Sequence, residues 1–416
     1  MAHVGIISPN ASGHLNPMIA LADAIRSRGH RITFFLLGAP PSSVSAAGFE
    51  VVQLGGAIFP VDEYKAGIQK LGTLSGRAAL SHTTALIARA TEAILQVGPS
   101  LVRETEVTAL VVDQSSFAGG TVADYLGLPF ATVCNALLLN AEPKIPPFFS
   151  SRQPRNSWWS RLQNKIGWAG LNRLYAPITK QIQVYRRKHG LAVPAQIADT
   201  WSDKIQISQQ PAAFEFPRQE LPQQFRFVGP MRRPNNNTLV PFPWDQLDGR
   251  PLIYASLGTL QNRAAAAFRV IAEACAGLDV QLVMTTGRGL APKNLGELSG
   301  RPIIVAYAPQ VELIHRSALV ITHAGLNTTL DALSVGVPMV AIPITNEQPG
   351  IAARIAWTGT GETLPAKRVT TKRLRSLVNR VWKEPSYRTA AERIRQSIQT
   401  GGGAPLAAKI IEKSFF

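Results

Sequence analysis

Short apolar runs alternate with longer helical patterns along this chain of 416 residues, and the alternation occurs twice. In the first part, the predicted strands are residues 4–8, 31–37, 51–54, 109–112 and 129–133. In the second part, they are residues 252–255, 281–285, 303–306, 319–322 and 339–342. Strands separated by helical crossovers favour a parallel sheet covered on both faces. We therefore expect an α/β fold of two Rossmann-like, doubly wound sheet domains.

The boundary between the two parts is a stretch rich in Pro and Asn with weak periodicity. It begins near Gly229-Pro-Met-Arg-Arg-Pro-Asn-Asn-Asn, a composition typical of an interdomain linker. We predict a first domain over residues 1–230, a linker over 231–249 and a second domain over 250–385. The helical tail, about residues 386–416, is expected to pack back onto the first domain.

Charge raises three classes of partner for this chain. There are 43 Lys and Arg against 26 Asp and Glu, a net charge of +17, which is compatible with nucleic acid, an anionic membrane or a phosphorylated ligand. No motif supports nucleic acid, which we do not expect as a partner. The two cysteines exclude a disulfide scaffold, and neither a spanning segment nor a signal-peptide pattern is found, so a cytoplasmic protein is expected.

Residues 151–190 concentrate part of this charge. The segment holds nine Lys and Arg, no Asp or Glu, and several aromatic residues, including Trp158, Trp159 and Trp168. One interpretation is a solvated helix with its aromatic residues turned to the core. A second is an interfacial element that meets an anionic membrane, in which case neutralising Arg186, Arg187 and Lys188 should weaken binding. A third is binding to nucleic acid.

Two polar residues follow the strands between which the strand order reverses in the first domain. His14 comes after the first strand and Asp113 after the fourth, so the two are expected to face each other at a topological switch point. A neutral imidazole can take a proton from a hydroxyl, and a carboxylate on its other nitrogen stabilises the imidazolium. The alternatives are a helix-start histidine without catalytic duty and a structural capping Asp.

The equivalent positions of the second domain predict a phosphate site. Ser256 and Thr259 follow its first strand, and His323, Asn327 and Thr328 follow its fourth, at the start of a helix. A helix N-terminus with hydroxyl and imidazole groups suits a phosphate. Three further side chains extend the predicted site. Asp331 could reach a ribose diol, and Glu347 and Gln348 could bind sugar hydroxyls. The alternative for Glu347 and Gln348 is an ordinary polar loop.

Several familiar signatures are missing from the sequence. No Gly-x-Gly-x-x-Gly follows the first strand, no Walker A sequence occurs, and no Asp-x-Asp or Cys/His cluster has metal-ligand spacing. We therefore expect no bound cofactor and no metal.

The second domain also carries a longer motif. Tyr307-Ala308-Pro-Gln310, His323-Ala-Gly325-Leu-Asn-Thr, Asp331-Ala-Leu, Gly336-Val-Pro-Met and Glu347-Gln348 resemble the donor-binding signature of family 1 nucleotide-sugar glycosyltransferases. Gly13 and His14, with Asp113, fall where that family keeps its catalytic His and Asp. Within the family, Val112-Asp-Gln, Cys134-Asn-Ala-Leu, Phe216-Pro-Arg and Gln348-Pro-Gly-Ile-Ala look like the bacterial zeaxanthin (carotenoid) glucosyltransferases.

The resemblance implies a GT-B fold, in which two Rossmann-like domains face each other across a cleft. It implies metal-independent, inverting transfer of a sugar, glucose from UDP-glucose, to a hydroxyl of a lipophilic acceptor such as a carotenoid. The implied catalytic residues are His14 and Asp113. The implied donor-binding residues are Gly13, Ser256, Thr259, Tyr307, Ala308, Gln310, His323, Gly325, Asn327, Thr328, Asp331, Glu347 and Gln348.

Two alternatives stay open at this point. The acceptor could be another hydrophobic alcohol or phenol, such as a sterol, a flavonoid or a macrolide. The chain could also be a nucleotide-sugar-binding partner subunit without catalytic activity.

Overall fold

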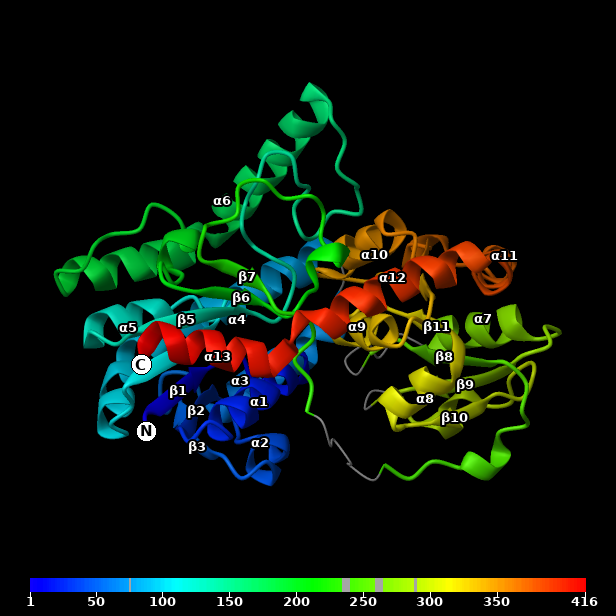
Figure 1. Ribbon diagram of the computed structural model, residues 1–416, viewed down its shortest axis with the longest axis horizontal. Helices are drawn as coiled ribbons and strands as arrows, with labels where there is room; N and C mark the ends of the chain where they lie inside the picture. Colours follow the sequence, from blue (N-terminus) through cyan, green and yellow to red (C-terminus); the bar gives the residue numbers. More distant parts are fainter. Residues whose placement is uncertain (75, 234–239, 259–264, 288–289) are drawn as a thin grey trace.

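The computed structural model describes residues 1–416 except 75, 234–239, 259–264 and 288–289. Two parallel sheets stand side by side, each flanked by helices (Figure 1). The α/β class and the two-sheet architecture expected from the sequence are confirmed.

The first sheet has seven strands in the order β3-β2-β1-β4-β5-β6-β7. Its strands are β1 (His3–Ile7), β2 (Arg31–Leu37), β3 (Glu50–Leu54), β4 (Ala109–Asp113), β5 (Phe130–Cys134), β6 (Gln206–Ser208) and β7 (Phe225–Phe227). All residues of β1, β4 and β5 are buried, as expected for parallel strands covered on both faces. Strand order reverses between β1 and β4, which pair with Ile7 opposite Val112.

The second sheet has six strands in the order β10-β9-β8-β11-β12-β13. Its strands are β8 (Leu252–Ser256), β9 (Gln281–Thr285), β10 (Ile303–Val305), β11 (Ser317–Thr322), β12 (Met339–Ala341) and β13 (Gly361–Thr363). The order reverses between β8 and β11, where Ser256 lies opposite Thr322. All ten strands predicted from the sequence are present, whereas β6, β7 and β13 were not predicted.

Thirteen α-helices surround the two sheets within the described residues. Those of the first part are α1 (Ser12–Arg26), α2 (Ser42–Ala46), α3 (Val61–Leu71), α4 (Gly76–Glu104), α5 (Gly119–Leu126) and α6 (Trp158–Lys188). Those of the second part are α7 (Ala265–Cys275), α8 (Gln310–Arg316), α9 (Leu326–Ser334), α10 (Gln348–Trp357), α11 (Thr371–Lys383), α12 (Pro385–Gly401) and α13 (Gly403–Phe415). No helix in the described part of the chain is both long and apolar enough to cross a bilayer.

The tail is two helices, which run along both halves of the molecule (Figure 1). Helix α12 packs on α9 of the second half and on the short 3-10 turn Ala212–Phe214 of the first, and α13 packs on α1. Ala407, Ala408 and Ile411 of α13 share a buried cluster with Met18, Leu21 and Ile25 of α1. The backbone N–H of Gly403 donates to the carbonyl of Val228 at 2.7 Å, which ties the tail to the segment that leaves the first sheet.

Candidate active site

His14 and Asp113 meet at the carboxyl edge of the first sheet. His14 lies in the first turn of α1, just after β1, and Asp113 is the last residue of β4. Because β1 and β4 are neighbours, the His14 Nδ1 and Asp113 Oδ2 atoms are brought within 2.8 Å of each other. The pairing expected from the sequence is therefore present in the structure.

The carboxylate of Asp113 is buried and held by two other residues. Its Oδ1 atom accepts hydrogen bonds from the backbone N–H of Ser115 at 2.9 Å and from the Ser115 hydroxyl at 2.5 Å. Its Oδ2 atom accepts one from Asn135 Nδ2 at 2.7 Å. Burial raises the pKa of Asp113, but the charge of His14 and the hydrogen bonds from His14, Ser115 and Asn135 outweigh it, so the pKa is lowered overall. The sequence analysis did not single out Ser115 or Asn135 as site residues, although Asn135 lies two residues after the predicted strand 129–133.

His14 is polarised by this carboxylate. Burial lowers its pKa, but the charge of Asp113, the hydrogen bond to Asp113 and the charge of Glu347 outweigh burial and raise the pKa above its usual value. Since the carboxylate only accepts, Nδ1 carries the proton and Nε2 keeps its lone pair when the ring is neutral. With 24% of its side chain exposed, the ring can meet a substrate. The contribution from Glu347 also indicates that this carboxylate of the second domain lies near His14.

His323 occupies the equivalent place in the second domain, in the turn between β11 and α9. Its ring lies against two glycines: a Cβ on Gly258 would be 2.9 Å from His323 Nε2, and one on Gly325 would be 2.6 Å away. Neither glycine could carry a side chain without moving the ring. Burial lowers the pKa of His323 to about 4, so the ring is neutral near pH 7.

Among the described residues of the second domain, three non-glycine residues hold a left-handed backbone: Arg301, with a φ of 46°, and two residues in the turns of the predicted site. Ala324 follows His323 with a φ of 64°, and Asn346 precedes Glu347 with a φ of 51°. This backbone conformation is uncommon in residues other than glycine, and strained backbone of this kind is concentrated at functional sites. Two of these three residues stand in the turns that carry the predicted phosphate and sugar ligands.

Asn327, predicted to bind phosphate, joins the two domains in this structure. Its Nδ2 atom donates to the carbonyl of Gly13 at 3.0 Å, and its Oδ1 atom accepts from Gln209 Nε2 at 3.2 Å. Gln209 Nε2 also donates to the backbone carbonyl of Asn135 at 2.6 Å. Gln209 thus connects Asn135, which binds Asp113, to Asn327 at the start of α9. The sequence analysis did not single out Gln209. Thr328, next in α9, is buried.

Asp331, predicted to bind ribose, is engaged on both oxygens. Arg232 Nε donates to its Oδ1 at 2.7 Å, and Gln310 Nε2 donates to its Oδ2 at 3.0 Å. Arg232 Nη2 also donates to the backbone carbonyl of Asn327 at 3.1 Å. The structure therefore brings Gln310 and Asp331 together, a contact that the sequence analysis did not predict. Arg232 was missed because it lies in the predicted linker, where sequence periodicity gives no signal.

The other predicted donor residues lie around this group. Tyr307 is exposed between β10 and α8, and Ala308 beside it is half-buried against the core. Ser256 is buried at the end of β8, where its carbonyl accepts from the backbone N–H of His323 at 3.3 Å. Thr259 lies outside the described residues.

Glu347 and Gln348 stand at the start of α10. The Gln348 Oε1 atom accepts from the backbone N–H groups of Ile344 and Thr345 at 2.8 and 2.9 Å, which fixes the turn before the helix. Farther along α10, Arg354 forms a buried ion pair with Glu215 of the first domain, at 3.1 Å from Nε and 2.5 Å from Nη2. The helix that carries the predicted sugar ligands is thereby anchored to the domain that carries His14.

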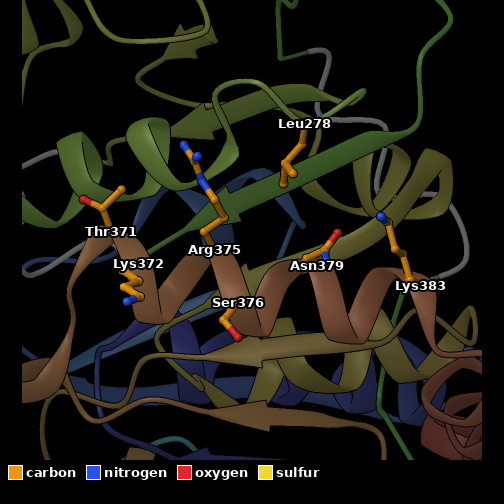
Figure 2. A pocket seen from close by; sticks show the side chains of 7 residues that line it. All are labelled: Leu278, Thr371, Lys372, Arg375, Ser376, Asn379 and Lys383. Atoms are coloured by element: carbon orange, nitrogen blue, oxygen red, sulfur yellow. The ribbon is translucent and has the colours of Figure 1, made fainter.

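A hollow of about 700 Å³ on the second domain is lined by none of these residues. Figure 2 shows its lining side chains, which come mainly from α11, with Leu278 beyond the end of α7. Arg375 points to that end and donates to the carbonyls of Glu273, Ala274 and Ala276. This arrangement satisfies the last carbonyls of α7 and explains Arg375 by structure alone.

No cluster of three or more His, Cys, Asp or Glu side chains arranged to hold a metal ion occurs in the part of the chain that the structure describes.

Comparison with known proteins finds similarity along the whole chain. The model of the family described as UDP-glucoronosyl and UDP-glucosyl transferase matches residues 102–399. The chain is 31% identical to the zeaxanthin glucosyltransferase of Pseudescherichia vulneris over 425 residues, covering 100% of this chain and 98% of the relative. It is 30% identical to the zeaxanthin glucosyltransferase of Pantoea ananas over 441 residues, covering 99% and 96%.

A similar fold is found among solved structures. The crystal structure of the glycotransferase of kitacinnamycin aligns with a TM-score of 0.76 at 21% identity, covering 100% of this chain and 99% of that one. At this level of identity the likeness concerns the fold, which is GT-B.

Proposed function

This chain belongs to the UDP-glucuronosyl and UDP-glucosyl transferase family and is a UDP-sugar glycosyltransferase, and we propose that it transfers glucose from UDP-glucose to a hydroxyl of a hydrophobic acceptor. The proposed acceptor is zeaxanthin or a related carotenoid, and the proposed reaction is a single displacement with inversion and without a metal. The observation that carries the proposal is the hydrogen-bonded pair of His14 and Asp113, which lies beside the donor turns of the second domain.

The proposed first event is removal of a proton from the acceptor hydroxyl. His14 Nε2 accepts that proton while Nδ1 stays hydrogen-bonded to Asp113, 2.8 Å away. The carboxylate stabilises the imidazolium that forms, and Ser115 and Asn135 keep the carboxylate ionised and oriented. The oxygen of the acceptor then forms a bond to the anomeric carbon as the bond from that carbon to the UDP oxygen breaks. Attack on the face opposite UDP inverts the configuration.

The leaving group carries its developing negative charge on the β-phosphate. We assign the neutral His323 ring, the backbone N–H groups at the start of α9, Asn327 and Thr328 and the hydroxyls of Ser256 and Thr259 to stabilise it. Gly13 and Gly325 leave room for the phosphates beside these groups, since neither carries a side chain. Helix α9 begins at Leu326 with Gly325 as its N-cap, and no side chain caps it, so its first N–H groups suit an anion.

The remaining contacts follow the length of the donor. Tyr307 and Ala308 are assigned to the uracil, which can stack on the tyrosine ring, with Gln310 at its edge. Asp331, held by Arg232 and Gln310, is assigned to the ribose diol. Glu347 and Gln348 are assigned to the hydroxyls of the sugar, and the influence of Glu347 on the pKa of His14 is consistent with a sugar bound between them.

The acceptor is proposed from the relatives. Two proteins named zeaxanthin glucosyltransferase match this chain over nearly its full length at 31% and 30% identity. A carotenoid dissolves in a bilayer rather than in water, so we also propose that residues 151–190 bring the enzyme to an anionic membrane.

A panel of acceptors tests the proposal. The enzyme is incubated with UDP-glucose and, separately, with zeaxanthin, a sterol, a flavonoid and a macrolide, and products are identified by mass spectrometry. We expect a glucoside of zeaxanthin, with the β configuration at the new bond by NMR. Transfer to another class with none to zeaxanthin would replace the acceptor, and an α product would contradict inversion.

A further inference from the structure

The outer end of α6 displays large apolar side chains to solvent. Trp158 is 74% exposed, Trp159 54% and Ile166 62%, and Leu162 is also exposed. Trp159, Leu162 and Ile166 are spaced three and four residues apart, so they share one face of the helix. Figure 1 shows α6 rising from the first domain, with one end projecting beyond the rest of the molecule. These four residues, called here the α6 apolar face, are an exposed cluster on a projecting helix.

The opposite side of this helix is well fixed. Ser157 caps its N-terminus by accepting from the backbone N–H of Ser160 at 3.2 Å. Asn164 Nδ2 donates to the carbonyl of Pro143 at 3.1 Å, and Trp168 Nε1 donates to the carbonyl of Ile145 at 2.9 Å. The aromatic residues of the segment thus divide into two groups. Trp168 and Tyr175 are buried in the core, whereas Trp158 and Trp159 are exposed and form an edge-to-face pair with ring centres 5.4 Å apart.

Basic side chains surround the α6 apolar face. Arg161 and Lys165 are exposed on the same helix, and Arg152 and Arg155 are exposed in the segment that leads into it. No Asp or Glu occurs between residues 151 and 190. One ion pair between described residues involves residues 151–190. It joins Arg186 to Asp124 at 2.7 Å, at the other end of the helix. The charge around the α6 apolar face is therefore uncompensated.

We propose that the α6 apolar face, with Arg152, Arg155, Arg161 and Lys165, docks on the surface of an anionic lipid bilayer. Tryptophan rings favour the boundary between headgroups and acyl chains, and neighbouring Lys and Arg side chains bind anionic headgroups. A second copy of the chain is a less suitable partner for the α6 apolar face, because its positive charges would repel those of the first copy. The purpose of the docking rests on the proposed membrane-dissolved acceptor, whereas the docking itself is measured without any substrate.

The same helix leads from this end to the active site. Tyr175 of α6 packs edge-to-face on Phe117, with ring centres 5.2 Å apart, and its pKa is raised by burial and by the charge of Glu347. Sixteen residues separate Trp159 from Tyr175, about 24 Å along a helix. A bilayer at the outer end would thus lie about 24 Å along α6 from Tyr175.

The structure also changes which charges are worth testing. The sequence analysis chose Arg186, Arg187 and Lys188, but Arg186 is buried and donates to Thr121 and Asp124 at 3.2 and 2.7 Å. Replacing it would disturb the packing of α6 on α5. Arg187 and Lys188 are exposed and serve as the matched control for Arg161 and Lys165.

The test is co-sedimentation of the full-length protein with vesicles, without donor or acceptor. The variants are Trp158→Ser with Trp159→Ser, Arg161→Gln with Lys165→Gln, and the control Arg187→Gln with Lys188→Gln. We expect the wild type to bind vesicles of phosphatidylcholine and phosphatidylglycerol, and binding to weaken at about 0.5 M salt, where the Debye length falls well below 10 Å. Each of the first two variants should bind roughly tenfold more weakly, and the control should bind almost like the wild type.

Quenching of tryptophan fluorescence by brominated lipids supplies a second readout. Quenching should occur in the wild type and be lost when Trp158 and Trp159 are replaced, while thermal unfolding midpoints stay the same. Equal binding to neutral vesicles by all variants, or equal loss in the control, would overturn the proposal. So would a dimer that depends on the two tryptophans while vesicle binding does not. Failure of the acceptor panel with intact vesicle binding would count against the proposed acceptor alone.

Discussion

The two histidines of the site, one in each domain, have opposite environments. His14 is hydrogen-bonded to a buried carboxylate that raises its pKa, whereas burial lowers the pKa of His323 to about 4. A raised pKa suits a group that accepts a proton during the reaction. A lowered pKa keeps a ring neutral beside a phosphate, where it can act as a hydrogen-bond donor without changing charge.

The polar groups around the two rings also differ in the hydrogen bonds that the protein supplies to them. Both oxygens of Asp113 accept hydrogen bonds from protein groups. On the donor side, His323 Nδ1 and Asn346 Oδ1 are buried without a hydrogen-bond partner among the described residues, and Ala324 and Asn346 hold left-handed backbone. Buried polar atoms are normally paired. Asn135 Oδ1, beside Asp113, is buried without a partner as well. The contrast therefore lies between Asp113, whose two oxygens are both paired, and the unpaired groups and left-handed turns of the proposed donor side.

Removal of the proposed base should have the largest effect. We expect His14→Ala to lower kcat by at least ~100-fold, because general-base catalysis is worth about 10²–10⁴-fold. The Michaelis constant for UDP-glucose should change little, since all proposed donor-binding residues except Gly13 lie in the second domain. His315→Ala, an exposed histidine of α8, is the control. Wild-type turnover in His14→Ala would remove His14 from the mechanism.

Displacing the His323 ring should have the next largest effect on activity. A Cβ at position 325 would lie 2.6 Å from His323 Nε2, so Gly325→Ala should displace the ring from the phosphate site. We expect kcat/KM for UDP-glucose to fall by roughly 10²-fold, the usual loss when one donor to the transition state is removed. Gly258→Ala should act in the same direction.

Gly170→Ala is the control for this substitution, because nothing lies within 4 Å of a Cβ at that position. Thermal unfolding midpoints separate loss of the site from loss of the fold. A folded Gly325→Ala enzyme with normal donor kinetics would show that the position of the His323 ring does not matter.

The pH profile sharpens the contrast between the two rings. His14 must be neutral to accept a proton, so kcat/KM should rise with pH through a pKa above the usual value of about 6.5. In Asp113→Asn, the charge that raises this pKa is gone while burial remains, and the rise should move to lower pH. Turnover should also fall, though less than in His14→Ala. An unchanged profile, measured over about pH 5 to 9, would show that Asp113 does not act on the titrating group.

The smallest expected effect is that of a chelator. If protein groups alone stabilise the leaving UDP, excess EDTA should change turnover by less than about twofold, because no Lewis acid has to be supplied. Activity lost in EDTA and restored by Mg²⁺ would mean that a metal completes the donor site. That outcome would leave the account of His14 and Asp113 intact.

Apolar strands were readily predicted from this sequence, including the three-residue β10 and β12, whereas three-residue strands with polar positions were not. The five-residue strands β1, β4 and β8 are continuous apolar runs between helical patterns, and these patterns largely fix a parallel sheet. In contrast, β6, β7 and β13 have three residues each and include polar positions. Such strands exist because a neighbouring strand supplies hydrogen bonds, which local periodicity does not reveal.

Some residues of the candidate site could also be predicted from the sequence, and others could not. His14 and Asp113 follow strands whose order is fixed by topology, so their meeting was predictable. Arg232 and Gln209 were not, since each gains its role only from side chains that are distant in sequence: Arg232 contacts Asp331, and Gln209 contacts Asn327. Their local sequence carries no corresponding pattern.

The sequence by itself determined the two parallel sheets and the family, and it predicted the candidate site at the carboxyl edges of the sheets, because these depend on local periodicity and on motifs of fixed spacing. Only the tertiary structure decided the protonation of the two histidines, since burial and a partner 99 residues away set their pKa values. It also decided which aromatic and basic side chains of residues 151–190 face water. Composition shows that such residues are present, but exposure depends on which side of the helix finds a partner.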